Sequence, residues 1–102
     1  MKMTIELIRA PTDEEIEQMC LAAEDAVRRH LMSKIPLKRL SDLDVMVEAV
    51  GDKPLMLSVD VAIELASGND DVDPLVDVAT DLAFSAAEAK ARELKLCLDT
   101  PA

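Results

Sequence analysis

The stretch LDVMVEAVGDKPLMLSVDVAIEL, residues 43–65, predicts a β-hairpin around which the rest of the chain is organised. Apolar residues occupy alternate positions in both halves, from Leu43 to Ala49 and from Leu55 to Leu65. A period of two places these residues on one face of a sheet. Because a two-stranded hairpin is marginally stable in water, we expect helices to cover this apolar face.

The same alternation constrains how the two halves pair. The inward residues are odd-numbered in both halves, so the loop between them must contain an odd number of residues. One such register opposes Asp44 and Asp60, and like charges directly opposite each other destabilise a sheet. We therefore predict that Gly51 pairs with Leu55, with residues 52–54 as the loop.

Two helices are predicted, over about residues 13–32 and 73–97. Thr12 and Glu15 have the spacing of a capping box at the start of the first helix. Asp73 and Pro74 are typical of a helix start, as N-cap and first helical residue. An additional N-terminal strand is predicted over residues 2–8, where polar and apolar residues alternate. The prediction is a single two-layer α+β domain, residues 1–102, with both helices on one face of a small antiparallel sheet.

The second helix is rich in alanine, and its spacing predicts which residues it buries. The predicted apolar stripe consists of Leu75, Val78, Ala79, Leu82, Ala86 and Ala89, flanked by Val76, Ala83, Ala87 and Leu94. Phe84 then lies on the outer, polar side of this helix. Leu21 is out of place in the same way on the first helix, so we expect both side chains to be exposed.

Composition limits the classes of partner. The chain has 21 acidic and 11 basic residues, and this net negative charge disfavours a polyanion as main partner. A single aromatic residue provides no platform for stacking bases. The N-terminus lacks the apolar run of a signal peptide, and no segment approaches the length of a membrane span. These features predict a cytoplasmic protein.

Residues that commonly carry catalysis or bind metals are scarce. His30 is the only histidine and lies within an apolar stripe, and the two cysteines, Cys20 and Cys97, are most simply core residues. The spacing of Asn69, Asp71 and Asp73 resembles a calcium loop but lacks its glycine and its bidentate glutamate. We therefore expect no enzyme activity, no cofactor and no metal site.

The outer face of the hairpin is the better candidate for a functional surface. Exposed apolar residues there interrupt a series of carboxylates, and such patches commonly mark protein interfaces. We expect this face to bind a second copy of the chain or another protein, with any self-association strengthened by salt. The predicted partner-binding residues are Met46 and Met56 on this face, with Val50 and Ala62 beside them, and Leu21 and Phe84 on the outer sides of the two helices.

A basic island is the second candidate surface. Residues 26–41 contain no acidic residue, although the chain as a whole is acidic. The basic residues of this island are Arg28, Arg29, Lys34, Lys38 and Arg39. They could bind a phosphate, RNA or an acidic segment, or simply complement the negative end of the first helix.

Three segments resemble a family of uncharacterised small archaeal proteins. They are the helix end AVRRH (26–30) and the strands LDVMVE (43–48) and LSVDV (57–61), and the likeness extends over most of residues 13–97. The resemblance implies an archaeal cytosolic protein with an α-β-β-α core. Genes of this family often lie near the gene for the prefoldin beta subunit, which implies a link to proteostasis or translation. The resemblance supplies no functional residues.

These observations together predict a non-catalytic module for protein interaction or assembly. The alternative is binding of a small anionic ligand or RNA by the basic island.

Overall fold

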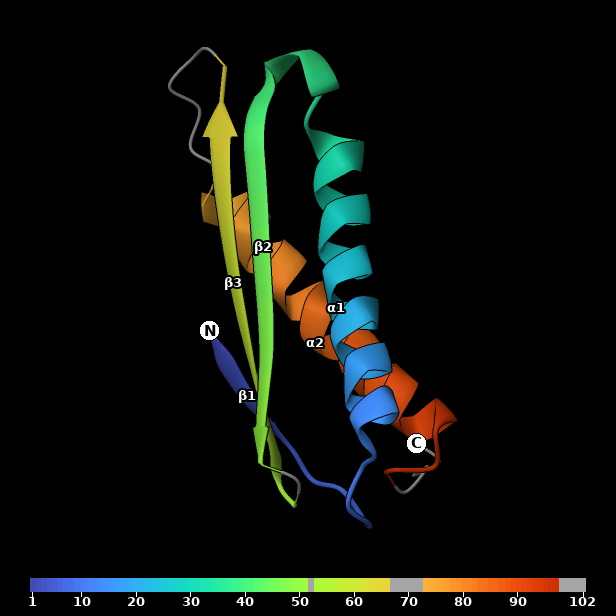
Figure 1. The fold of residues 1–102 in the computed structure, drawn as a ribbon. Helices are drawn as coiled ribbons and strands as arrows, with labels where there is room; N and C mark the ends of the chain where they lie inside the picture. Colours follow the sequence, from blue (N-terminus) through green and yellow to red (C-terminus); the bar gives the residue numbers. More distant parts are fainter. Residues whose placement is uncertain (52, 67–72, 98–102) are drawn as a thin grey trace.

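The described residues form three antiparallel strands and two long helices (Figure 1). In the computed structural model, the described residues are 1–51, 53–66 and 73–97. The elements in chain order are β1 (Lys2–Ile5), α1 (Asp13–Lys34), the short 3₁₀ helix η1 (Leu37–Arg39), β2 (Leu40–Gly51), β3 (Leu55–Leu65) and α2 (Asp73–Glu93). This layout confirms the predicted α+β class.

The hairpin β2–β3 has the predicted register. Gly51 pairs with Leu55, and this register sets Asp44 opposite Ala62. Of the predicted loop, Asp52 lies outside the described residues. Gly51 has a φ of 86°, and a Cβ atom on it would lie 2.9 Å from the carbonyl oxygen of Pro54. Glycine is therefore the residue that this turn requires.

The predicted N-terminal strand is present as β1, although it is shorter than residues 2–8. It pairs with the outer edge of β3, where Met3 lies opposite Leu57, and gives the strand order β1-β3-β2. The chain leaves the sheet after Ile5 because Ile8 instead donates its N–H to the carbonyl of Leu96, at 2.8 Å. Leu96 lies beyond the end of α2. The sheet therefore has β2 at one edge and the short β1 at the other.

The first helix begins as predicted, with a complete capping box. The Glu15 N–H donates to the Thr12 hydroxyl at 3.1 Å, and the Thr12 N–H donates to the Glu15 carboxylate at 2.9 Å. The helix continues to Lys34, two residues past the predicted end. Its buried residues are Met19, Ala23, Val27 and Leu31.

The second helix begins at Asp73 as predicted but ends at Glu93, so the predicted end at residue 97 is wrong. Lys95 has a φ of 63°, the left-handed conformation that terminates a helix. The Leu96 N–H donates to the Ala91 carbonyl at 2.8 Å, and the Lys95 N–H to the Arg92 carbonyl at 3.1 Å. This is a Schellman motif, and it turns the fully buried Leu96 back into the core.

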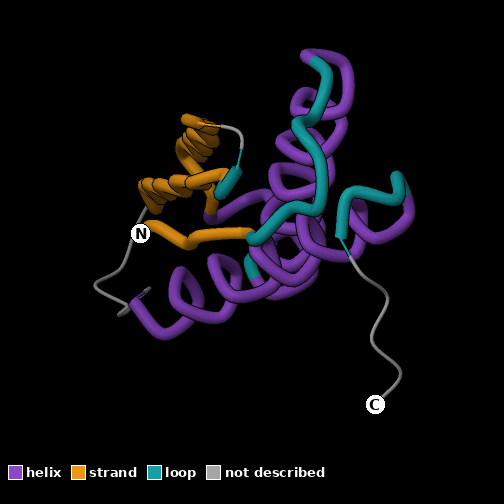
Figure 2. Tube along the Cα trace, turned by 90° about the horizontal axis from the view of Figure 1, so that it is seen from below, coloured by secondary structure: helices purple, strands orange, loops and turns teal. Residues whose placement is uncertain are grey.

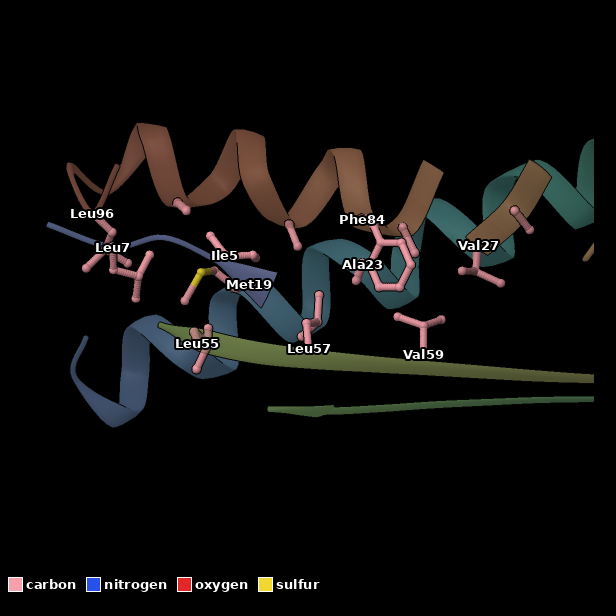
Figure 3. Packing of buried hydrophobic residues seen from close by; sticks show 14 of the residues in the cluster. Ile5, Leu7, Met19, Ala23, Val27, Leu55, Leu57, Val59, Phe84 and Leu96 are labelled. Atoms are coloured by element: carbon pink, nitrogen blue, oxygen red, sulfur yellow. The ribbon is translucent and has the colours of Figure 1, made fainter. Parts of the chain in front are cut away.

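The predicted apolar stripe of α2 is correct at Ala79 and at Leu75, which packs against the core, but wrong at Val78 and Leu82, because the helix is rotated toward the flanking residues Ala83 and Ala87. Val78 and Leu82 are exposed, whereas Phe84 is only 8% exposed. Figure 3 shows the Phe84 ring directed from α2 toward Val59 of β3. The core-facing residues are Ala79, Thr80, Ala83, Phe84, Ala87 and Ala91. Four alanines at four-residue spacing let α2 lie close to α1, and this contact decides the rotation of the helix.

The helices cover one face of the sheet, as predicted. Seen from below in Figure 2, they lie to the right of and below the strands, and the opposite side of the sheet carries no helix of the described residues. The buried face of β3 contributes Leu55, Leu57 and Val59 to the core. No helix in the described part of the chain is long and apolar enough to cross a membrane.

Candidate interaction surface

The outer face of the sheet, opposite the helices, combines apolar and acidic side chains. Met46, Val50 and Met56 are 52%, 66% and 44% exposed. Val50 and Met56 are directly paired across β2 and β3, and Met46 lies on the same face opposite Asp60. An exposed apolar group on a sheet face that no described helix covers is typical of an interaction surface.

Carboxylates flank Met46, and Glu48 lies between it and the Val50–Met56 pair, which is at the turn end of the hairpin. Asp42, Asp44, Glu48, Asp60 and Glu64 are all exposed on the same face. Asp42 and Glu64 are directly opposite each other, which is unfavourable for two like charges. The positive charges that β1 brings nearby are Lys2 and the N-terminal ammonium, which lies 3.7 Å from the Asp60 carboxylate. The face is therefore acidic overall, with Met46 among the carboxylates and an apolar pair at the end of the hairpin.

The structure does not bring all four predicted partner-binding residues together. Met46 and Met56 share the outer face, but Leu21 lies on α1 in the helical layer, where it lines a shallow depression with Ala22, Asp25 and Lys90. Phe84 is in the core, so the expectation that it is exposed is wrong. Sequence reasoning missed the exposure of Val78 and Leu82, the apolar residues that α2 presents to the surface instead of Phe84.

The basic island is partly neutralised by pairs within α1. Arg28 forms an ion pair with Glu24, and the Arg29 Nε lies 2.9 Å from the Asp25 carboxylate. Lys34 is the last residue of α1, while Lys38 and Arg39 belong to η1, and all three are exposed. The acidic partners, Glu24 and Asp25, precede residue 26 and so are not among residues 26–41. Their spacing of four residues from the two arginines could have predicted both ion pairs from the sequence.

The cysteines and the histidine form no catalytic group in the described structure. Burial raises the pKa of the Cys20 thiol and that of the Cys97 thiol, which disfavours the reactive thiolate. Cys97 lies beyond the end of α2, and its thiol donates to the Glu6 carbonyl at 3.4 Å. His30 is half-buried on α1. Asn69 and Asp71 lie outside the described residues.

A hollow of about 440 Å³ lies between the β1 end of the chain and α2. Its charged lining residues are Glu6, Glu88 and Arg92, of which Glu88 and Arg92 form a helical ion pair at 3.9 Å. The described residues contain no group of three or more side chains that could hold a metal ion. The outer face of the sheet is therefore the strongest candidate for a functional surface.

Comparisons with known proteins find family and fold without an activity. A family described as "Protein of unknown function (DUF3194)" matches residues 8–95. The fold resembles a crystal structure from Thermococcus onnurineus NA1, with a TM-score of 0.70 and 22% identity over 92% of this chain and 93% of that one.

A second similar fold is the solution structure of the hypothetical protein mth677 from Methanothermobacter thermautotrophicus. Its TM-score is 0.70, with 17% identity over 86% of this chain and 97% of that chain. A search of curated proteins finds no match. Both structural relatives are archaeal, and at these identities they support the fold alone.

Proposed function

Since the chain belongs to the family of proteins of unknown function designated DUF3194, we propose a function from its surface: a non-catalytic module that binds another protein. The bound element is a cationic amphipathic segment, and it occupies the outer face of the sheet. The observation that supports this proposal is the set of exposed apolar side chains Met46, Val50 and Met56 beside a series of carboxylates, on a face that no described helix covers.

The chemistry of this face favours a cationic partner. Apolar side chains of a partner gain free energy by covering the two methionines, whose flexible thioethers adapt to different shapes. Lysine or arginine side chains of the same segment meet the carboxylates beside Met46. A second copy placed face to face brings the carboxylates of both chains together instead, which opposes association.

Methionine methyl groups provide a direct test. In protein labelled with ¹³C at the methionine methyl groups, Met46 and Met56 report on the outer face, Met19 on the core and Met32 on the exposed side of α1. Of these four methionines, we expect a model amphipathic peptide rich in lysine and leucine to shift the signals of Met46 and Met56 only. A matched peptide with glutamate in place of lysine should leave the same four signals unchanged.

Variants complete the experiment. Met46→Ser and Met56→Ser should weaken peptide binding, whereas Met32→Ser, an equally exposed methionine on the helical layer, should not. Equal shifts at Met32 would show only general attraction between a cationic peptide and an acidic protein. That result, or no shift at Met46 and Met56, contradicts the proposal.

A further inference from the structure

The backbone of β2 has a free edge, and hydrogen bonds elsewhere in the sheet show which of its residues face that edge. The Val59 N–H donates to the Met1 carbonyl at 2.8 Å, and the Met1 ammonium donates to the Val59 carbonyl at 2.9 Å. Both backbone groups of Val59 therefore point toward the β1 side, away from β2. Backbone direction alternates along a strand, so the odd-numbered residues of β3 share this direction.

The consequence for β2 follows from the register. Val47 lies opposite Val59, and since Val59 turns its backbone away, this pair is not hydrogen-bonded. The N–H and C=O groups of Val47 then point outward, as do those of Leu43, Val45 and Ala49. At the far end of the hairpin, the even-numbered Ala66 donates to the Arg39 carbonyl at 2.7 Å, which agrees with this alternation.

This edge is long and open. The strand β2 spans Leu40–Gly51 and is the last strand on its side of the sheet, at the front of the view in Figure 1. No described residue hydrogen-bonds the outward groups of Leu43, Val45, Val47 and Ala49. A row of unpaired donors and acceptors is a template for another strand.

We propose that β2 pairs antiparallel with β2 of a second copy, with Val47 at the two-fold axis. The outward residues are odd-numbered in both copies, so odd residues pair with odd residues. Val47 then lies opposite Val47, and Val45 opposite Ala49, all on the half-buried inner face. The two sheets join into one, with the helices of both copies on the same side.

Repulsion between carboxylates favours this register over the two registers shifted by one residue at the axis. With Val47 at the axis, the outer face sets Met46 opposite Glu48 of the second copy and Asp44 opposite Val50, so no two carboxylates within β2 are directly opposed; Asp42 falls opposite position 52, beyond the end of β2. Moving the axis to Met46 opposes Asp44 and Glu48, and moving it to Glu48 opposes that residue to itself. Like charges directly opposite destabilise a sheet, so these shifted pairings are disfavoured.

A charge substitution tests both the edge and the register. The variant Met46→Lys places an ammonium opposite Glu48 of the second copy in the proposed pairing, so the dimer should tighten about three- to tenfold. Met46→Glu should weaken it by a similar factor. Met56→Lys is the matched control, because it makes the same charge change on the same face but on β3, away from the paired edges.

Sedimentation equilibrium from micromolar to submillimolar concentration measures these changes. Amide hydrogen exchange supplies a second reading: the N–H groups of Val45, Val47 and Ala49 should become protected as protein concentration rises. Those of Met46 and Glu48, already directed toward β3, should change little.

Three results overturn the proposal. One is a monomer at all concentrations for both the unmodified protein and Met46→Lys. Another is that Met56→Lys tightens the dimer as much as Met46→Lys does. That result would mean that association depends on the outer face or on net charge. The third is weakening by Met46→Lys, the result expected when Met46 lies at the axis. The proposal concerns the edge of the sheet, so it stands or falls separately from peptide binding on the outer face.

Discussion

The Arg9 guanidinium holds the Glu15 carboxylate with two parallel hydrogen bonds, of 2.9 and 2.7 Å, and donates a further one, of 2.9 Å, to the Leu94 carbonyl. One side chain thus connects the start of α1 to the residue that follows α2. The Glu15 carboxylate also accepts the Thr12 N–H of the capping box. The N-terminal end of α1 and the C-terminal end of α2 are therefore fastened together.

This arrangement predicts a pH-dependent contribution to stability. The hydrogen bonds from Arg9, followed by the one from the Thr12 N–H, lower the pKa of Glu15 from its ordinary value of 4.5 to about 2. A carboxylate with a lowered folded-state pKa stabilises the protein above its unfolded pKa, and this contribution is lost as the pH falls toward 2.

We therefore expect Glu15→Gln to lower the free energy of unfolding at pH 7. The difference from the unmodified protein should shrink between pH 4.5 and about 2. Urea denaturation at a series of pH values measures it, with Glu14→Gln as the control on the exposed side of the same turn. A difference that does not change with pH would contradict the role assigned to the carboxylate.

The two faces of β3 should respond differently to truncation. Val59 is fully buried, and Val59→Ala should cost about 1 to 3 kcal/mol of unfolding free energy, because it leaves a cavity in the core. Met56 is exposed on the outer face, so Met56→Ala should cost less. Chemical denaturation of both variants gives the order, and the reverse order would mean that the faces are assigned wrongly.

The close contact between α1 and α2 depends on small side chains. Ala83 is fully buried on the face of α2 that meets the core, and Ala83→Leu should destabilise the protein by about 1 to 3 kcal/mol through overpacking. Ala89 is exposed on the same helix, and Ala89→Leu should change stability by less than about 0.5 kcal/mol. Thermal and urea unfolding compare the two, and similar costs would refute the observed rotation of α2.

Removal of the opposed carboxylates on the outer face should be stabilising. Glu64→Gln relieves the repulsion with Asp42, for a gain of about 0.2 to 1 kcal/mol at low salt. The gain should shrink in 1 M salt, where the screening length is about 3 Å. Asp44→Asn is the control, because Asp44 faces Ala62. An equal gain from the control would point to net charge instead of this pair.

The alternative function, anion binding by the basic island, has its own signature. If Lys38 and Arg39 hold a phosphate group or RNA, replacing both with glutamine should abolish that binding and leave the melting temperature nearly unchanged, since both are exposed. Calorimetric titration with phosphate, nucleotides and RNA at two salt concentrations measures it. The absence of any salt-sensitive binding across these ligands would exclude this alternative.

Much of the fold and part of the candidate surface could be read from local pattern. The alternation of residues 43–65 determines both faces of the hairpin, because a shift of one residue in either strand would expose every inward side chain. It also placed Met46 and Met56 on the outer face, where the structure has them. Thr12 and Glu15 marked the start of α1, because a capping box is a local arrangement of neighbouring backbone and side-chain groups.

The rotation and the end of α2 were decided only by tertiary structure. Small or apolar residues occur on most sides of this helix, so periodicity alone does not say whether Leu82 or Phe84 faces the core. Contact with α1 selects the alanine face, because alanines allow the closest approach of two helices, and this buries Phe84. The helix ends without a glycine because burial of Leu96 and the hydrogen bonds of the Schellman motif offset the cost of the left-handed conformation at Lys95.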